Sequence, residues 1–376
     1  MIRNILLGLL ISLTLFNISS CSSDDDNNNN EQAIPSFIVI GKKDNDNAFQ
    51  YDYNRESQSG ELINLGEQQI PANYNSVDFK EDVLCFVAPQ STSFKNIRTN
   101  EITTVDLIFN NSNGELAFSH TYSSSHIFSA YQKMVGSNDM YIRSKNIFDA
   151  SEVDIPIGKA DLVNGLLYSQ NRLVVAYLVR ENLQTLYYVT VLNTIDNSIV
   201  KTLEFDAGVK FITTDTSGNL MLGSFSSSST SSELKVYKLN SMELSAEYTS
   251  SSFFTGISNG LFQNNNLFYL QPFPQPSAIP FLPSVYNIET NVTNTIDILP
   301  ALFNYAMNDD DIDNISLINS IVNFENNTLL VSTNFTQING NNLINKVGVF
   351  LFDFNGNILS DIVIDEDFRP LHIYLK

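Results

Sequence analysis

The stretch from Lys210 to Thr249 reads KFITTDTSGNLMLGSFSSSSTSSELKVYKLNSMELSAEYT, and it contains four short runs with the composition of strands. These runs lie at Phe211–Thr214, Leu220–Gly223, Leu234–Leu239 and Glu243–Tyr248, with clusters of Asp, Ser, Asn or Gly between them. Runs of about four to eight β-forming residues bounded by turn-forming clusters are typical of β-strands. The stretch therefore predicts four consecutive strands, which we name A, B, C and D.

The same four-strand unit recurs along the chain. Strand B is predicted at Phe37–Ile40, Val83–Phe86, Met140–Ile142, Leu173–Ala176, Leu220–Leu222, Leu267–Leu270 and Leu329–Val331. Strand C is predicted at Phe49–Tyr53, Thr104–Phe109, Leu186–Leu192, Leu234–Leu239, Val285–Ile288 and Val347–Phe354. A repeated unit of roughly 40–50 residues with four strands predicts an all-β chain folded as a β-propeller. Seven copies of strand B predict seven blades, and six or eight are also compatible because the unit after Met140 is short.

The two ends of the repeated region complement each other. The first unit begins directly at strand B, Phe37–Ile40, whereas the chain ends in Pro370–Leu375, which resembles a strand A with no strand B after it. The C-terminal strand is therefore predicted to complete the first blade, which closes the ring and removes free sheet edges. The alternative is a two-sheet sandwich, which the regular unit length disfavours.

Over residues 34–376 this pattern resembles secreted propeller domains of the WD40-like and quinoprotein-like kind. The turn Asp215-Thr216-Ser217-Gly218-Asn219-Leu220 is similar to hairpins of such blades, and Gly218 suits the left-handed backbone of a tight hairpin. The chain has no Trp, so the Trp-Asp dipeptide of WD40 repeats is absent. The resemblance implies one propeller domain over residues 34–376 and says nothing of an activity.

The N-terminus has the features of a lipoprotein signal peptide. Arg3 precedes an apolar run from Ile5 to Phe16, which is too short to span a bilayer but suits a signal-peptide core. The following residues, Ile18-Ser19-Ser20-Cys21, resemble the bacterial lipobox. The resemblance implies removal of residues 1–20 and attachment of diacylglycerol and fatty acyl chains such as palmitate to Cys21. The alternative is an ordinary secretory signal.

Residues 21–33 form a polar tract that cannot bury enough apolar surface to fold, so we expect a flexible tether. Its beginning, Cys21-Ser22-Ser23-Asp24-Asp25-Asp26, resembles the acidic export tag of Bacteroidetes lipoproteins on the outer face of the outer membrane. That resemblance implies a lipid-anchored protein exposed at the cell surface. The alternative is a plain linker without a sorting role.

The charge and cysteine content exclude several classes of protein. The chain carries 41 Asp and Glu against 20 Lys and Arg, a net charge of −21, and such a surface repels nucleic acid. Cys85 is the only cysteine after Cys21, so no disulfide can form within the folded body. Because Cys85 lies in an apolar run that resembles a strand, we expect a buried structural thiol and not a nucleophile.

The longer connecting segments are predicted to lie on one face of the ring. In an up-and-down blade, the B–C and D–A connections share a face, and the A–B and C–D turns share the other. The long segments, Gln90–Glu101, Ser224–Ser232, Gln271–Pro283, Asn304–Asn314 and Asn334–Asn345, all fall between B and C or between D and A. Long loops on a rigid scaffold commonly bind partners, although surface loops also tolerate neutral insertions.

Candidate ligand residues are few. Asp309, Asp311 and Asp313 alternate in a way that suits Ca²⁺, but Asn314 and Ser320 stand where an EF-hand loop needs Gly and Glu, and a solvated acidic loop is the simpler interpretation. His120 and His126 could approach each other only through a turn at Ser123–Ser125.

The segment Pro272–Pro283 is rich in proline, which favours an extended conformation. Its Phe273 and Phe281 are candidate contact residues for a partner, unless they fold back onto the propeller. No motif marks a catalytic residue.

The sequence therefore predicts a non-enzymatic surface propeller that binds a protein, glycan or small molecule, potentially as an accessory to outer-membrane uptake. One alternative is a propeller enzyme, such as a metal-dependent lactonase or hydrolase, with its ligands around the axis. Several carboxylates at the axis would favour the enzyme, whereas Ser, Thr and apolar side chains would count against it. A further alternative is a structural or adhesive surface protein.

Overall fold

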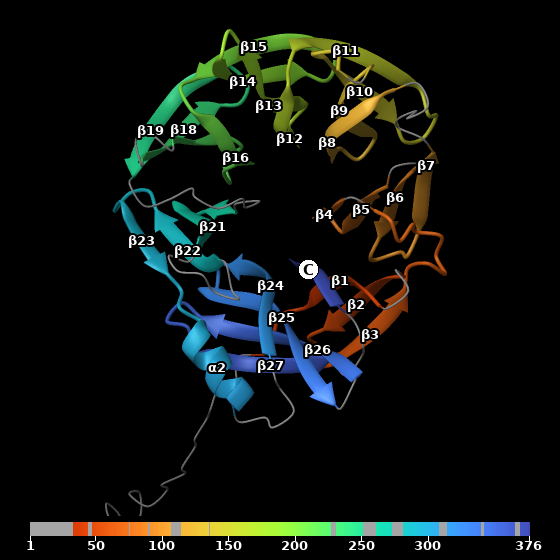
Figure 1. Ribbon diagram of the computed structural model, residues 1–376, viewed down its shortest axis with the longest axis vertical. Helices are drawn as coiled ribbons and strands as arrows, with labels where there is room; N and C mark the ends of the chain where they lie inside the picture. Colours follow the sequence, from red (N-terminus) through yellow and green to blue (C-terminus); the bar gives the residue numbers. More distant parts are fainter. Residues whose placement is uncertain are drawn as a thin grey trace, which may run out of the picture.

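The computed structural model describes residues 33–376 except 44–46, 75, 89–90, 107–113, 135, 227–230, 251–260, 273–280, 308–313, 340–341 and 365–368. These residues form seven four-stranded antiparallel sheets arranged as blades around a central axis (Figure 1). The predicted seven-bladed propeller is thus confirmed. Among the described residues, no helix has the length and apolar character needed to cross a membrane.

Each blade contains four strands in the order A to D from the axis outward. Blade 1 has β28 (Arg369–Leu375), β1 (Phe37–Lys42), β2 (Ala48–Asn54) and β3 (Ser59–Asn64); blade 2 has β4 (Ser76–Lys80), β5 (Val83–Val87), β6 (Ser91–Asn96) and β7 (Ile102–Asp106). Blade 3 has β8 (Leu116–Tyr122), β9 (His126–Gln132), β10 (Asp139–Asn146) and β11 (Glu152–Lys159); blade 4 has β12 (Leu162–Ser169), β13 (Arg172–Glu181), β14 (Gln184–Asn193) and β15 (Ser198–Phe205). Blade 5 has β16 (Gly208–Thr214), β17 (Leu220–Ser226), β18 (Ser231–Lys238) and β19 (Glu243–Ser250). Blade 6 has β20 (Phe262–Gln263), β21 (Asn266–Pro272), β22 (Phe281–Asn287) and β23 (Val292–Thr295); blade 7 has β24 (Asn314–Asn323), β25 (Thr328–Asn339), β26 (Asn342–Asp353) and β27 (Ile358–Ile364), and α2 (Leu299–Met307) precedes it.

The core is divided among the contacts between neighbouring blades. Seven clusters of buried apolar side chains lie between consecutive blades, one at each contact around the ring. Second strands are covered on both faces, as in β1, where Phe37 to Gly41 are all buried, and they therefore read as continuous apolar runs. Fourth strands such as β15 are largely exposed because they form the rim.

The C-terminal strand closes the ring as predicted. β28 pairs antiparallel with β1, and the C-terminus lies beside β1 in Figure 1. The hydroxyl of Tyr374 donates to the carbonyl oxygen of Val77 on blade 2 at 2.9 Å, and the Asn319 amide of blade 7 donates to the carbonyl oxygen of Leu371 at 3.4 Å. The last strand therefore connects three blades.

A repeated turn explains part of the high Asn content. In five of the C–D turns the side-chain oxygen of an Asn accepts the backbone N–H two residues later, and the residue four positions after that Asn has a positive φ. The pairs are Asn54 and Gln58, Asn96 and Asn100, Asn146 and Ala150, Asn193 and Asn197, and Asn287 and Asn291. Such side-chain caps let the hairpin backbone turn without losing its hydrogen bonds.

The strand assignment in blades 2 and 3 was wrong at two places. Met140–Ile142 belongs to the third strand, β10, and the second strand of blade 3 is His126–Gln132. In blade 2 the third strand is Ser91–Asn96, within the segment expected to be a long loop, and Thr104 belongs to the fourth strand. Both errors arise because second and third strands are similarly buried, so their apolar runs look alike.

The long connections do lie on one face as predicted, but most of the segments predicted as long loops were assigned wrongly. Gln90–Glu101 contains β6, and Ser224–Ser232 contains the end of β17 and the start of β18. Residues 334–345 mostly extend the hairpin of β25 and β26, and Asn304 to Met307 belong to α2. The connections that are long, 65–75, 107–115, 251–261, 273–280 and 296–313, nevertheless all run between B and C or between D and A. We refer to this side of the ring as the long-connection face.

Candidate functional site

Most of the residues singled out in the sequence lie outside the described residues. This applies to Cys21 with its tether, to Phe273, and to Asp309, Asp311 and Asp313. Phe281 begins β22, where its backbone pairs with Pro272. Within the described part of the chain, no three His, Cys, Asp or Glu side chains come close enough to hold a metal ion.

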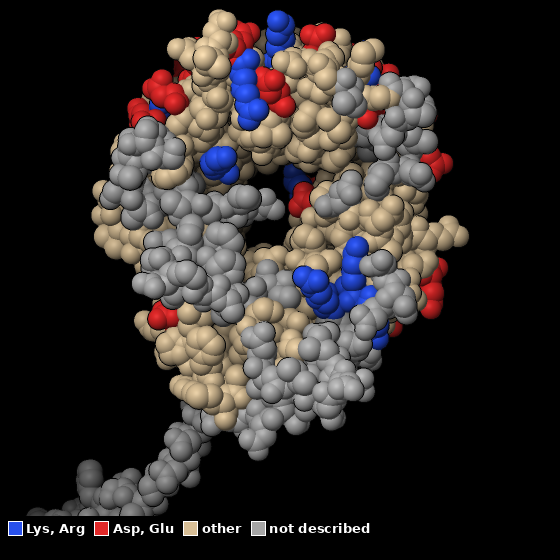
Figure 2. All heavy atoms as spheres, viewed as in Figure 1, with Lys and Arg blue, Asp and Glu red and all other residues tan. Residues whose placement is uncertain are grey.

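The axial channel contains a cavity. It has a volume of about 550 Å³ and is walled by the first strands of four successive blades, β4, β8, β12 and β16. Figure 2 shows the opening at the centre of the ring. Each of these strands pairs only with the second strand of its own blade, so its other edge keeps unpaired backbone N–H and C=O groups next to the channel. The sheet edges thus add polar groups to the cavity wall.

A repeated β-bulge shapes this wall. Five first strands change register near the same point, with one extra residue opposite the second strand. The extra residues are Phe118, Asn164, Lys210, Ile318 and Leu371. A bulge twists a strand and redirects its side chains, and bulges are common beside functional sites. Phe118 and Asn164 line the cavity.

Asp78 on β4 is the only acidic residue among those that line the cavity. Its Oδ1 accepts the backbone N–H of Phe79 at 2.9 Å. The side chain is accessible from the channel, yet the enclosing ring desolvates it, and this burial raises the pKa of the carboxyl despite the Phe79 hydrogen bond and the charge of Lys80. Lys80 itself points to blade 4, where its Nζ donates to the carbonyl oxygen of Tyr168 at 3.4 Å.

His120 on β8 lines the same cavity as a neutral imidazole. Burial lowers its pKa to about 4, and its Nδ1 lies 2.8 Å from the hydroxyl of Ser129 on β9. The Ser123–Ser125 turn does form, but His126 has its own partner, Ser125, at 2.9 Å. The histidines therefore occupy separate positions on two strands.

Cys85, Asp78 and His120 border a small recess of about 20 Å³ beside the channel. Cys85 is 2% exposed and unpaired, and burial, together with the charge of Asp78, raises the pKa of its thiol. The predicted burial of Cys85 is confirmed, and a protonated, buried thiol is a poor nucleophile.

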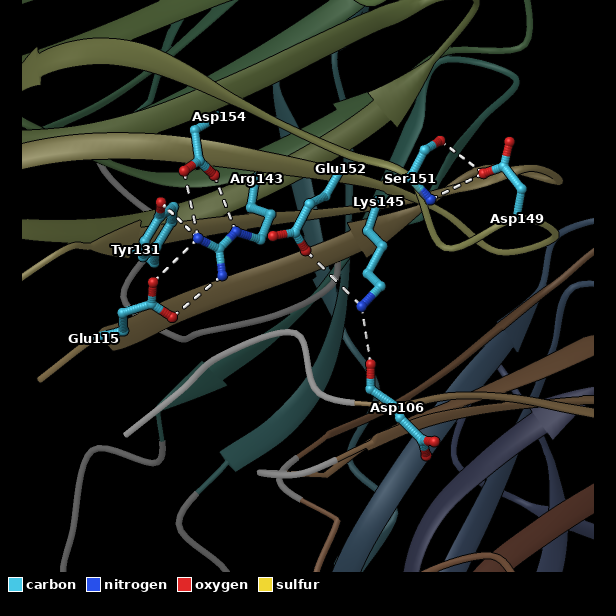
Figure 3. Close-up of polar contacts among 9 residues, drawn as sticks. All are labelled: Asp106, Glu115, Tyr131, Arg143, Lys145, Asp149, Ser151, Glu152 and Asp154. Atoms are coloured by element: carbon cyan, nitrogen blue, oxygen red, sulfur yellow. Dashed lines mark hydrogen bonds and ion pairs between the residues drawn. The ribbon is translucent and has the colours of Figure 1, made fainter. Parts of the chain in front are cut away.

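A second polar cluster lies in blade 3 and reaches blade 2 (Figure 3). The Arg143 guanidinium donates to both Glu115 carboxylate oxygens at 3.1 and 3.2 Å, to Asp154 at 2.9 Å and to the Tyr131 hydroxyl at 3.0 Å. Burial lowers the pKa of Arg143, but the hydrogen bonds to Asp154 and Glu115 outweigh it and raise the pKa. These four residues belong to blade 3 or directly precede its first strand, and blade 2 is reached by Lys145, whose Nζ donates to the carbonyl oxygen of Asp106 at 2.9 Å. Because the charge of Arg143 is compensated, the cluster leaves no charge for a ligand.

Another cavity, of about 340 Å³, opens between blades 2 and 3 among the turns. Phe94, Tyr122, Ile147 and Phe148 provide its apolar wall. Phe148 is 77% exposed at a C–D turn, so this depression faces away from the long connections.

No protein-family model and no curated protein matches the chain. Among solved structures, a quinoprotein alcohol dehydrogenase-like protein from Bacteroides thetaiotaomicron aligns with a TM-score of 0.54 at 9% identity, covering 91% of this chain and 78% of that one. Puromycin hydrolase aligns with a TM-score of 0.50 at 8% identity, covering 89% of this chain and 55% of the hydrolase. The propeller domain of the trilobed protease from Pyrococcus furiosus gives 0.49 at 10% identity, covering 87% and 94%. At these identities the likeness shows the fold alone, a β-propeller.

The channel site was not identified in the sequence. Its residues are single positions between Ser76 and Thr213, each in an ordinary strand, and no local motif marks them. The sequence contained one signal that could have indicated the site, the extra residue in the first strand of several blades. Recognising that residue requires knowing how the first and second strands pair.

Proposed function

We propose that this protein is a lipid-anchored binding propeller of the cell surface, with its ligand site in the axial channel. The observation that carries the proposal is the cavity of about 550 Å³, whose wall combines Ser, Thr and Asn side chains with apolar ones. Small-molecule sites in proteins are typically concave, and polar groups in their walls orient the ligand.

The composition of the wall favours binding over metal-dependent hydrolysis. Of the residues that line the cavity, only Asp78 is acidic and only His120 is a histidine. The residues around them include Ser119, Thr121 and Thr213. An axis lined by hydroxyl and apolar side chains, with one carboxylate, counts against a metal-dependent lactonase or hydrolase.

The surface location rests on the lipobox-like Cys21 and the acidic tract behind it. A lipidated Cys21 and a flexible tether would hold the ring outside the membrane, with the long-connection face available to partners. This part of the proposal is tested by metabolic labelling with a palmitate analogue and by protease treatment of intact cells. We expect the label to be lost in Cys21→Ser, and an unlabelled wild-type protein would exclude the anchor.

Ligand binding is tested by screening the full-length protein against a chemically broad library of small molecules, using thermal shift. Thr213→Phe fills the channel, and Phe148→Ala alters the other cavity as a matched control. We expect stabilising compounds to act on the wild type and on Phe148→Ala but not on Thr213→Phe. If no compound stabilises the wild type, or if hits act equally on Thr213→Phe, the channel is not the binding site.

A further inference from the structure

Asp78 brings a negative charge into the axial cavity without an ion-pair partner among the described residues. Its nearest basic neighbour in sequence, Lys80, is held against Tyr168, with Nζ 5.6 Å from the ring centroid and hydrogen-bonded to the backbone of the same residue. The carboxylate therefore receives one backbone N–H and no cationic side chain.

Such a charge favours a counter-ion. Asp78 is exposed to the channel, but the strands around it reduce its hydration, and opposite charges attract more strongly where water is restricted. No Lys or Arg is among the residues that line the cavity. A cation that enters the channel would supply this counter-ion, and the net charge of −21 on the whole chain attracts cations to the molecule.

The rest of the wall indicates which kind of cation fits. Ser76, Thr121 and Asn164 bring side-chain oxygens, and the unpaired edges of the first strands bring carbonyl oxygens, all of which can accept from an ammonium N–H. Phe118, Leu166 and Ile212 provide apolar surface in the same cavity. The wall thus suits a ligand with a charged amine head and a short apolar body.

We propose that the axial channel binds a small primary ammonium ion with an apolar body, with Asp78 as its counter-ion. This inference rests on the proposed function, since it names the ligand class of the same cavity. The other acceptors orient the ammonium group, and Phe118 contacts the body of the ligand.

The inference is tested with two pairs of probes that differ mainly in charge, hexylamine against 1-hexanol and phenethylamine against 2-phenylethanol. Isothermal titration calorimetry compares the full-length wild type with Asp78→Asn, which keeps an oxygen for the Phe79 N–H. Glu204→Gln is the control, because it removes an exposed charge from the outer strand β15. We expect the amines to bind more tightly than the alcohols, and Asp78→Asn to weaken amine binding about tenfold or more with Glu204→Gln unchanged.

Several outcomes would overturn the inference. Alcohols that bind as tightly as the amines, or amines that bind Asp78→Asn as tightly as the wild type, would reject the ammonium site and leave the channel as a site for neutral ligands. Binding of Ca²⁺ that depends on Asp78, without amine binding, would also reject it. If neither amines nor alcohols bind, the inference fails, and only the library screen with Thr213→Phe decides on the proposed function.

Discussion

Two neighbouring blades bury a cation in different ways. Within blade 3, Arg143 is enclosed by two carboxylates and a tyrosine. Between blades 1 and 2, Lys95 is fully buried, and its Nζ has no hydrogen-bond partner in the structure. Burial lowers the pKa of Lys95 to about 8 against the opposing charges of Asp52 and Glu61. The comparison shows that one buried cation is compensated by hydrogen-bonded carboxylates, whereas the other has opposite charges nearby but no hydrogen-bond partner.

The blade 1–2 contact has further unsatisfied groups. The side-chain oxygens of Gln50 and Tyr74 are also buried without a hydrogen-bond partner, and Tyr74 packs in the apolar cluster of this contact. The carboxylate of Asp52, which could compensate Lys95, instead binds Lys376 and the amide of Gln50. Lys376 therefore pairs with the Asp52 carboxylate, which would otherwise be the counter-ion of Lys95.

The largest effect is expected from breaking the compensated cluster. Arg143→Met leaves Glu115 and Asp154 without their main cation, and their side chains are only 11% and 25% exposed. We expect the free energy of unfolding in urea to fall by about 3–5 kcal/mol. Arg143→Lys keeps the charge but loses the two-pronged contact, so it should lose less. Equal losses in the two variants would show that charge compensation is not the main contribution.

A gain in stability, and not a loss, is expected from a substitution at Lys95 between blades 1 and 2. Lys95→Met removes a poorly compensated buried charge and keeps an apolar side chain of similar length. We expect stability at pH 7 to rise by about 3 kcal/mol, since the pKa falls from 10.5 to about 8 and each pKa unit corresponds to about 1.4 kcal/mol. Urea unfolding of the two proteins checks this, and a less stable variant would mean that Lys95 makes favourable contacts.

The pH dependence sharpens the same comparison. The pKa of Lys95 is lower in the folded protein than in the unfolded chain, about 8 against 10.5, so folding carries its full penalty below pH 8. The penalty decreases as the pH rises from 8 towards 10.5. We expect the stability advantage of Lys95→Met to shrink by about 1 kcal/mol or more between pH 7 and pH 10. The measured quantity is the difference in unfolding free energy between Lys95→Met and the wild type at each pH, in which the contributions of other titrating groups cancel. A difference that stays constant with pH would contradict the lowered pKa of Lys95.

The smallest effect concerns the hydrogen bond that links the closing strand to blade 2. Tyr374→Phe removes the donor to the Val77 carbonyl oxygen while keeping the ring in the blade 1–2 cluster. We expect a loss of about 1 kcal/mol, measured as a lower midpoint in urea. Tyr168→Phe, whose hydroxyl bonds only exposed Asn171, serves as the control. A similar loss in both variants would indicate that the closing hydrogen bond has no special importance.

The fold was largely predictable from the sequence, whereas the site was not. The second strands of most blades are buried on both faces and gave apolar runs at regular spacing, and Pro370–Leu375 identified the closure. Blades 2 and 3 were misassigned because apolar runs alone do not distinguish second from third strands. The Asn caps at Asn96 and Asn146 mark C–D turns and would have corrected both blades.

The channel escapes prediction for a different physical reason. Asp78, His120, Asn164 and Thr213 are brought together only by the ring, across four blades. Nothing in the alternation of a single strand distinguishes Asp78 from an ordinary exposed carboxylate. Its environment depends on which strands enclose it, and that follows from the closed geometry.

The position of β1 at the seam also determines how the molecule would carry a mechanical load. β1 is paired along its length with β2 on one side and β28 on the other. A pull on the chain before Ile34 therefore acts along a strand that is held by two ladders, which must slide in shear rather than open one bond at a time. If the protein is tethered through its N-terminus, drag from a moving fluid or a bound particle would thus enter the ring at a strand suited to resist it.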